Sequence, residues 1–130
     1  MSVGLLDHYN IRTGNLEQTV SFYEAVLGLT NGDRPNFSFP GAWLYSDGRA
    51  VVHLIDVSGQ AEPAKTGTGA IDHIAFVSRG FEAMKAHLET TGYEYQARVV
   101  PGGALWQIFV RDPNGVLLEL NYEAANETAA

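Results

Sequence analysis

Metal-ligating and proton-moving side chains stand in apolar stretches of this sequence at four places, namely His8, His53, His73 and Glu119. Imidazole nitrogens and a carboxylate suit Fe(II), Mn(II), Ni(II) or Zn(II), and two histidines with one carboxylate leave coordination positions open for substrate and water. A carboxylate flanked by leucines is costly to bury unless it is paired or bound to a cation. These residues therefore predict a mononuclear metal site.

The remaining composition narrows the chemistry of that site. The chain has no cysteine, so disulfides, thiolate metal sites and cysteine nucleophiles are excluded. The fourth histidine, His87, lies between Lys85 and Glu89 in a helical pattern, and we expect it to be a solvated helix position. Any metal ion must therefore be held by the other histidines and by carboxylates.

An internal repeat relates the four candidate residues. Residues 6–11 align with residues 71–76 at an offset of about 65, and residues 51–54 align with residues 117–120. In the first pair of segments His8 matches His73, and in the second pair His53 matches Glu119. If pseudo-twofold symmetry relates the halves, all four side chains converge on one cavity.

Each half reads as strand, helix and three strands, and the first strands, at residues 6–11 and 71–76, contain His8 and His73. Apolar residues spaced three and four apart predict helices that end at Gly28 and Gly92, and Asn15 with Gln18 is typical of a helix N-cap. Period-two alternation predicts strands at residues 37–39, 42–45, 50–57, 95–100, 105–111 and 116–122. The chain is thus expected to be an α+β protein of two βαβββ modules, at about residues 5–57 and 70–123, with a linker at 58–69 and a C-terminal tail at 124–130.

Length and charge fit one small domain with a small-molecule substrate. The chain has 130 residues, of which 45% are hydrophobic and 18% charged, and its formal net charge is −7. No basic cluster is long enough to follow a phosphate backbone, which argues against nucleic acid and anionic membranes. The sequence also contains no secretory or membrane-spanning pattern, so we expect a cytoplasmic protein.

Strand alternation assigns further side chains to the faces of the candidate site. The residues expected to contact a substrate are Asn10, Trp43, Tyr45, Gln107, Phe109 and Asn121. The aromatic residues expected to be core or cavity wall are Phe37, Phe39 and Trp106. The arginines expected at solvated loop or strand-end positions are Arg34, Arg49 and Arg98.

Several motifs resemble those of the vicinal oxygen chelate superfamily, which includes glyoxalase I, extradiol dioxygenases, methylmalonyl-CoA epimerase and fosfomycin-resistance proteins. The resemblance covers nearly the whole chain, in residues 6–8, 21–29, 71–76, 112–115 and 118–120. It implies two βαβββ modules that form an incompletely closed, mixed-sheet barrel around one divalent metal. His8, His73 and Glu119 match the shared ligands.

The same resemblance suggests which reactions to compare. His53 falls where glyoxalase I and the epimerase carry a glutamate, and it is expected to be a catalytic acid/base or a fourth ligand. Phe109 falls where extradiol dioxygenases usually carry a catalytic tyrosine. The His, His, Glu triad gives a dioxygenase-like enzyme with Fe(II) or Mn(II) a slight lead. The alternatives are a glyoxalase-like lyase or isomerase with Ni(II) or Zn(II), and a bleomycin-resistance-like binding protein. Superfamily members pair their modules either within one chain or across a swapped dimer, and a homodimer is expected here.

Overall fold

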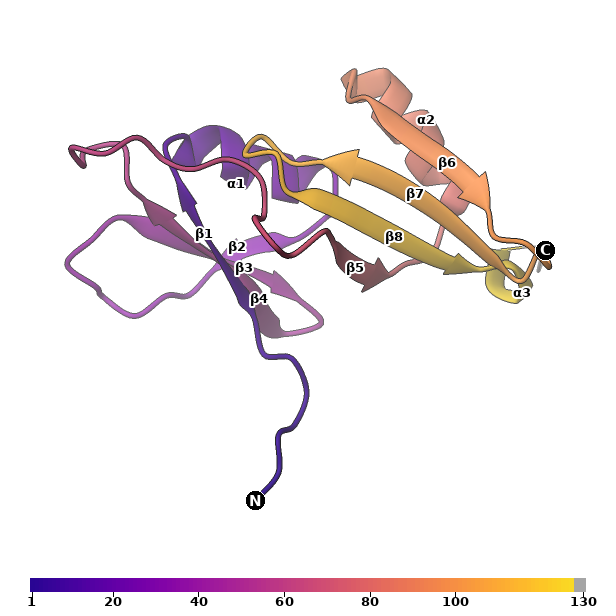
Figure 1. The fold of residues 1–130 in the computed structure, drawn as a ribbon, viewed down its shortest axis with the longest axis horizontal. Coiled ribbons are helices and arrows are strands. Elements are labelled where there is room, and N and C mark those ends of the chain that lie inside the picture. The colour runs from indigo at the N-terminus through magenta and orange to yellow at the C-terminus, as the bar shows by residue number, and fades with distance from the viewer. Residues whose placement is uncertain (128–130) are drawn as a thin grey trace. The chain divides into compact units, whose positions relative to one another are not determined.

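The computed structural model describes residues 1–127 of the chain. It divides into two compact units, Met1–Lys65 (unit 1) and Thr66–Ala130 (unit 2). In Figure 1 unit 1 runs from indigo to magenta and unit 2 continues towards yellow. The last three residues of the expected tail, 128–130, lie outside the described residues.

Unit 1 is a four-stranded mixed sheet with one helix. Its elements are β1 (Tyr9–Thr13), α1 (Leu16–Ala25), β2 (Thr30–Gly32), β3 (Gly41–Ser46) and β4 (Arg49–Asp56). The strand order is β1-β4-β3-β2, in which β1 runs parallel to β4 and the other neighbours are antiparallel.

Unit 2 repeats this arrangement and adds a short helix. Its elements are β5 (Ile74–Val77), α2 (Phe81–Thr91), β6 (Tyr95–Val99), β7 (Leu105–Arg111), β8 (Leu117–Glu123) and α3 (Ala124–Glu127). The strand order is β5-β8-β7-β6, again with one parallel pair, β5 and β8. The expected α+β class with two βαβββ modules is confirmed.

Alternation along the strands gives each sheet a buried face and an open face. In unit 1, α1 packs on β3 and β4, and the buried strand residues are Ile11, Ala42, Leu44, Val52 and Leu54. In unit 2 the buried set is Ile108, Val110, Leu118, Leu120 and Tyr122, with Phe81 and Leu88 of α2. Side chains that alternate with these sets lie on the opposite, open faces of the two sheets. Those open faces carry the candidate site residues.

The helix ends agree with the sequence in part. Gly28 and Gly92 have φ angles of 71° and 81°, and such left-handed conformations at helix ends favour glycine. Asn15 occupies the N-cap position of α1, but its side chain makes no capping hydrogen bond. Its backbone N–H instead donates to the Thr13 hydroxyl at 2.9 Å. The carboxylate of Glu127 accepts a hydrogen bond of 2.6 Å from the Phe81 N–H, so α3 supplies the cap of α2.

Two strand predictions are wrong. His8 and His73 were expected inside strands, but each stands one residue before its strand, because pairing with the parallel partner begins only at Tyr9 and Ile74. Residues 37–39 form no strand, since Pro35 and Pro40 bracket the segment and proline cannot donate to a sheet ladder. Within the described part of the chain, no helix is long and apolar enough to cross a membrane.

Candidate metal centre

His8 stands at the start of β1 with one ring nitrogen already engaged. Its Nδ1 lies 2.6 Å from Oδ2 of Asp7, and since a carboxylate only accepts, the imidazole Nδ1–H is the donor. This bond lowers the pKa of Asp7. Histidines that bind metals usually donate their second N–H to such a carboxylate, which fixes the tautomer. The arrangement therefore leaves Nε2 as the ring nitrogen that can bind a metal ion.

His73 repeats this arrangement in unit 2. Its Nδ1–H donates to Oδ2 of Asp72 at 2.8 Å, and its Nε2 lies 3.5 Å from Oε1 of Glu119. The hydrogen bond to Asp72 and the negative charge of Glu119 raise the pKa of His73, against a smaller opposing effect of burial. The charged form of His73 carries its second proton on Nε2, and a bound cation would take the place of that proton.

The Glu119 carboxylate is largely enclosed and is oriented from one side. Its side chain is 12% exposed, and its Oε2 accepts a hydrogen bond of 2.9 Å from the Asn121 amide. Two ligand atoms each about 2.1 Å from one tetrahedral ion stand about 3.4 Å apart. The 3.5 Å between Oε1 and His73 Nε2 fits that spacing, so this pair suits a common cation.

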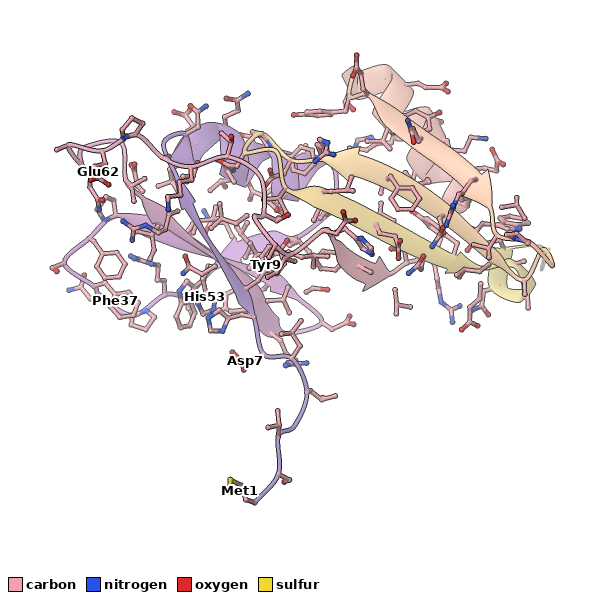
Figure 2. The ribbon with its side chains drawn as sticks, viewed as in Figure 1. Met1, Asp7, Tyr9, Phe37, His53 and Glu62 are labelled. Carbon is pink, nitrogen blue, oxygen red and sulfur yellow. The ribbon has the colours of Figure 1, made fainter. Side chains whose placement is uncertain are left out.

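His53 lies in β4, on the open face of unit 1, inside a stack of three rings. Its imidazole stacks on His8 with ring centroids 3.6 Å apart and on Trp43 at 4.0 Å, each with planes 12° from parallel. Figure 2 labels His53 together with Asp7, which precedes β1, and Phe37, from the segment between β2 and β3. The two flanking rings hold the plane of the His53 imidazole.

A backbone hydrogen bond fixes which nitrogen of His53 is protonated. Nε2 lies 3.1 Å from the carbonyl oxygen of Ala50, and a carbonyl can only accept, so Nε2 carries the hydrogen and Nδ1 the lone pair. Burial, and then the neighbouring His8, lower the pKa of His53. His53 is therefore a neutral imidazole at neutral pH, with an unprotonated Nδ1.

The candidate ligands are divided between the two units. His8 and His53 lie together in unit 1, and His73 and Glu119 lie together in unit 2. Among residues 1–127, no three His, Asp or Glu side chains gather closely enough to hold an ion. Each unit thus carries a pair of donors, and each of His8 and His73 has its own aspartate.

The structure places the expected substrate-contact residues in different surroundings. Asn10 and Trp43 are the cross-strand neighbours of His53, and Phe109 is the neighbour of Glu119. Gln107 and Asn121 form hydrogen bonds within unit 2. Tyr45, after a bulge in β3, donates its hydroxyl to the Asp33 carbonyl at 2.5 Å.

The expected wall residues and the arginines agree with expectation only in part. Phe37 and Phe39 are 42% and 40% exposed, so neither is core, and the Arg34 guanidinium carbon lies 4.9 and 5.0 Å from their ring centroids. Arg49 donates to the Leu6 carbonyl. Trp106 packs against Phe81 with ring centroids 5.2 Å apart, as expected of a core or wall residue.

Unit 2 contains a cavity of about 960 Å³ that follows β6 and the end of α2. The open-face residues that line it are Gln96, Arg98, Phe109, Arg111 and Leu117. None of the four candidate ligands lines it. Because Asp7–His8, Asp72–His73 and Glu119 carry the ordered donor atoms, we place the candidate site at those residues.

Three contributors were missed in the sequence. Asp7 and Asp72 orient the histidines that follow them, and Arg98 bonds to Gln107. The Asp-His pair recurs at matching positions of the repeat, so that doublet could have identified both aspartates. For Arg98 the sequence carried no signal, because its bond depends on cross-strand register.

Replacing Asp72 with Asn tests the role of the aspartates. The amide has the shape of the carboxylate but no charge, so its oxygen accepts a weaker hydrogen bond from His73 Nδ1–H and His73 loses part of its basicity. We expect the dissociation constant for a divalent ion to rise about 10- to 100-fold, with little change in unfolding free energy because the Asp72 side chain is 86% exposed. Metal titration and denaturant unfolding measure the two effects, and Asp56→Asn is a matched control. Equal metal affinity in wild type and Asp72→Asn would contradict this role.

Comparison with known proteins places the fold in a known group. A sequence model described as the Glyoxalase/Bleomycin resistance protein/Dioxygenase superfamily matches residues 5–120. A "Probable lactoylglutathione lyase" from Vibrio parahaemolyticus is 32% identical over 129 residues, covering 92% of this chain and 91% of the relative. "Glyoxylase I 4" from Arabidopsis thaliana is 29% identical over 119 residues, covering 88% of this chain and 68% of the relative.

Solved structures share the fold at low sequence identity. A glyoxylase/bleomycin resistance protein/dioxygenase domain from Frankia has a TM-score of 0.77 at 16% identity, covering 94% of this chain and 93% of its own. A putative glyoxalase family protein from Bacillus anthracis has a TM-score of 0.74 at 19% identity, covering 95% and 98%. At these identities the likeness concerns the fold alone.

Proposed function

Because the chain belongs to the Glyoxalase/Bleomycin resistance protein/Dioxygenase superfamily, we propose that it is a mononuclear divalent-metal lyase or isomerase. In this proposal the enzyme transfers a proton to or from the carbon atom next to an oxygen-bearing carbon of a small substrate. His8, His73 and Glu119 would hold the ion, and His53 would be the acid/base group. The bound ion would act as a Lewis acid that stabilises negative charge on a substrate oxygen.

The observation that carries this proposal is the stacking of His53 on His8. The lone pair of an imidazole nitrogen lies in the ring plane, and these two planes are nearly parallel, with centroids 3.6 Å apart. Lone pairs in two parallel, stacked planes do not converge on one point, so His8 and His53 would not both hold one ion. This geometry supports His8 as the ligand and His53 as a base beside the ion, rather than as a fourth ligand.

His53 also has the features that a general base needs. Its Nδ1 is unprotonated because Nε2–H donates to Ala50, and its lowered pKa keeps the imidazole neutral at neutral pH. Trp43 covers one face of the ring and His8 the other, so a substrate can approach His53 only at the ring edge. Asn10 is the neighbour of His53 on the open face, and in this proposal it would contact the substrate there.

We rank the lyase or isomerase above the dioxygenase, which reverses the order expected from the His, His, Glu triad alone. Relatives named as lactoylglutathione lyases are 29% and 32% identical over most of the chain. Phe109 beside Glu119 has no hydroxyl to donate or accept a proton. Ring cleavage with Fe(II) or Mn(II) stays the second candidate, because the His, His, Glu donor set suits it equally. The lyase or isomerase is proposed to use a divalent ion such as Ni(II) or Zn(II).

Replacing His53 with Gln separates the base from the ligands. The variant keeps a polar side chain in the stack but has no basic nitrogen, so we expect turnover to fall about 10²- to 10⁴-fold with metal content unchanged. Elemental analysis and steady-state kinetics measure the two quantities on the same preparation. Loss of the ion in His53→Gln, or full turnover in this variant, would contradict the assigned role.

The proposed reaction class can be tested by proton exchange. The metal-loaded protein is incubated in D2O with lactoylglutathione and with small hydroxycarbonyl compounds, and proton NMR follows the carbon-bound hydrogen next to the carbonyl. A lyase or isomerase exchanges that hydrogen with solvent. Oxygen uptake with catechols and no exchange would favour the dioxygenase, and tight binding with neither reaction would favour a bleomycin-resistance-like binding protein.

We also propose that the active form is a homodimer. The ligand pairs lie in different units, and a second copy of the chain can supply the complementary pair. Light scattering of the metal-free and metal-loaded protein tests this point, and a monomer with full metal content would contradict it.

A further inference from the structure

Four side chains on the open face of unit 2 form one unbroken chain of hydrogen bonds. Arg98 Nε donates to Gln107 Oε1 at 2.7 Å, Gln107 Nε2 donates to Asn121 Oδ1 at 3.0 Å, and Asn121 Nδ2 donates to Glu119 Oε2 at 2.9 Å. We call these four residues the relay. It begins at a cation on the edge strand β6 and ends at the carboxylate expected to bind the metal ion.

The strand register explains why the relay crosses the sheet. Arg98 is the cross-strand partner of Gln107, and Gln107 is the partner of Asn121. Directly paired side chains on one face of a sheet lie about 5 Å apart, which is within reach of one hydrogen bond. Asn121 and Glu119 are two residues apart on β8 and therefore share that face.

The two charged ends determine how both amides are oriented. A guanidinium can only donate, so the oxygen of Gln107 must face Arg98 and its NH2 group must face Asn121. The Asn121 oxygen then accepts from Gln107, and its NH2 group donates to Glu119. Every group in the relay thus meets a partner of the opposite hydrogen-bonding type. Reversing either amide would break two bonds.

Gln107, in the middle of the relay, and Glu119, at its end, are shielded from water. Gln107 is 6% exposed and the Glu119 side chain 12% exposed, whereas Arg98 is exposed. Hydrogen bonds that end on ions are stronger than neutral ones, and they polarise one another when water is excluded. Arg98 is held in addition by Phe109, whose ring centroid lies 5.6 Å from the guanidinium carbon.

We propose that Arg98 is a positioning residue that acts through Gln107 and Asn121 to orient the Glu119 carboxylate for binding metal through one oxygen. Asn121 occupies Oε2, and the other oxygen, Oε1, is the one that lies 3.5 Å from His73 Nε2. This inference rests on the metal site proposed above. It adds a residue on a different strand from any proposed ligand, and it predicts that Glu119 binds the ion through Oε1 alone.

The test compares Arg98→Met with Arg111→Met in titrations of metal-free protein with Co(II), followed by optical absorption. Both variants lose one positive charge from the same sheet, but Arg111 donates to the Gly115 carbonyl and is outside the relay. We expect the Co(II) dissociation constant of Arg98→Met to rise about tenfold and that of Arg111→Met to change less than twofold. Equal rises in both variants would overturn the proposal.

A second background tests whether the effect passes through the carboxylate. In Glu119→Gln protein the charged end of the relay is absent, so adding Arg98→Met should weaken Co(II) binding no further. Gln107→Leu should weaken binding about as much as Arg98→Met, and the double variant no more than either alone, since both interrupt one chain of bonds. Independent, multiplying effects would contradict the relay.

A metal-free measurement keeps the relay separate from the proposed function. In apo protein, Arg98→Met should shift the side-chain NH2 signals of both Gln107 and Asn121 in ¹⁵N-resolved NMR spectra, and Arg98→Lys should restore them in part. If wild-type protein binds no Co(II), the proposed function fails and these signals alone decide the relay. Unchanged Asn121 signals in Arg98→Met would overturn the relay whatever the metal affinity.

Discussion

Replacing Glu119 with Gln is expected to weaken binding of a divalent ion by more than 100-fold, beyond the ~10- to 100-fold cost of changing an outer-shell partner. The amide keeps the size of the side chain and can still accept the hydrogen bond from Asn121. It lacks the negative charge that both the ion and His73 would use. Isothermal titration of metal-free protein measures the change, and turnover is expected to fall with metal occupancy.

The same variant should keep its fold. Glu119 is 12% exposed, and neutralising a largely buried carboxylate removes a desolvation cost in metal-free protein. We expect the free energy of unfolding to change by about 1 kcal/mol or less. Glu123→Gln, which removes the same charge from an exposed position on β8, is the matched control. If both variants bind metal equally well, Glu119 is not a ligand.

The second large effect is expected on stability, at the opposite face of the same strand. Leu118 is fully buried in unit 2, between its cross-strand neighbours Ile74 and Val110. Truncating such a leucine removes its burial energy and leaves a cavity, so Leu118→Ala should lower the free energy of unfolding by about 2–5 kcal/mol. Urea unfolding followed by circular dichroism measures this change.

Leu117→Ala is the control for Leu118→Ala. Leu117 precedes Leu118 on β8, is partly exposed and points to the other face, so its truncation should cost about 1 kcal/mol. Equal losses in the two variants would contradict the assignment of the faces. Under conditions where Leu118→Ala stays folded, its metal affinity should match that of wild type, since the Leu118 side chain lies on the face of the sheet opposite Glu119.

Much of the fold follows from patterns that are local in sequence. The alternation of Leu118, Leu120 and Tyr122 with Leu117, Glu119 and Asn121 predicts β8 and its two faces, and the burial of the first three is confirmed. Gly28 and Gly92 mark helix ends because left-handed backbone at those points favours glycine. The repeat predicts that one arrangement of elements occurs twice, which the sheet orders confirm.

Other features depend on interactions between distant residues. The exact start of β1 and β5 is set by where the parallel partner begins to pair, so His8 and His73 could not be placed before their strands from apolar pattern alone. Residues 37–39 look like a strand in isolation, but the flanking prolines keep them out of the sheet. The bond from Arg98 to Gln107 requires the register of β6 against β7.

The candidate site was predictable in its residue types but less so in its internal arrangement. Four donor side chains at matching positions of the repeat pointed to metal chemistry. Which of them are ligands depends on ring orientation, such as the parallel stacking of His8 and His53, and sequence contains no information on ring orientation. The roles of Asp7 and Asp72 depend likewise on the side-chain hydrogen bonds.

Metal stoichiometry tests the proposal that His8, His73 and Glu119 hold one ion. The protein is expressed without a metal-affinity tag, and metal per chain is determined for wild type, His8→Ala and His73→Ala. We expect one ion per chain in wild type and loss of that ion in both variants, although the two residues belong to different units. Full metal content in either variant, or two ions per chain that the variants lose separately, would contradict it.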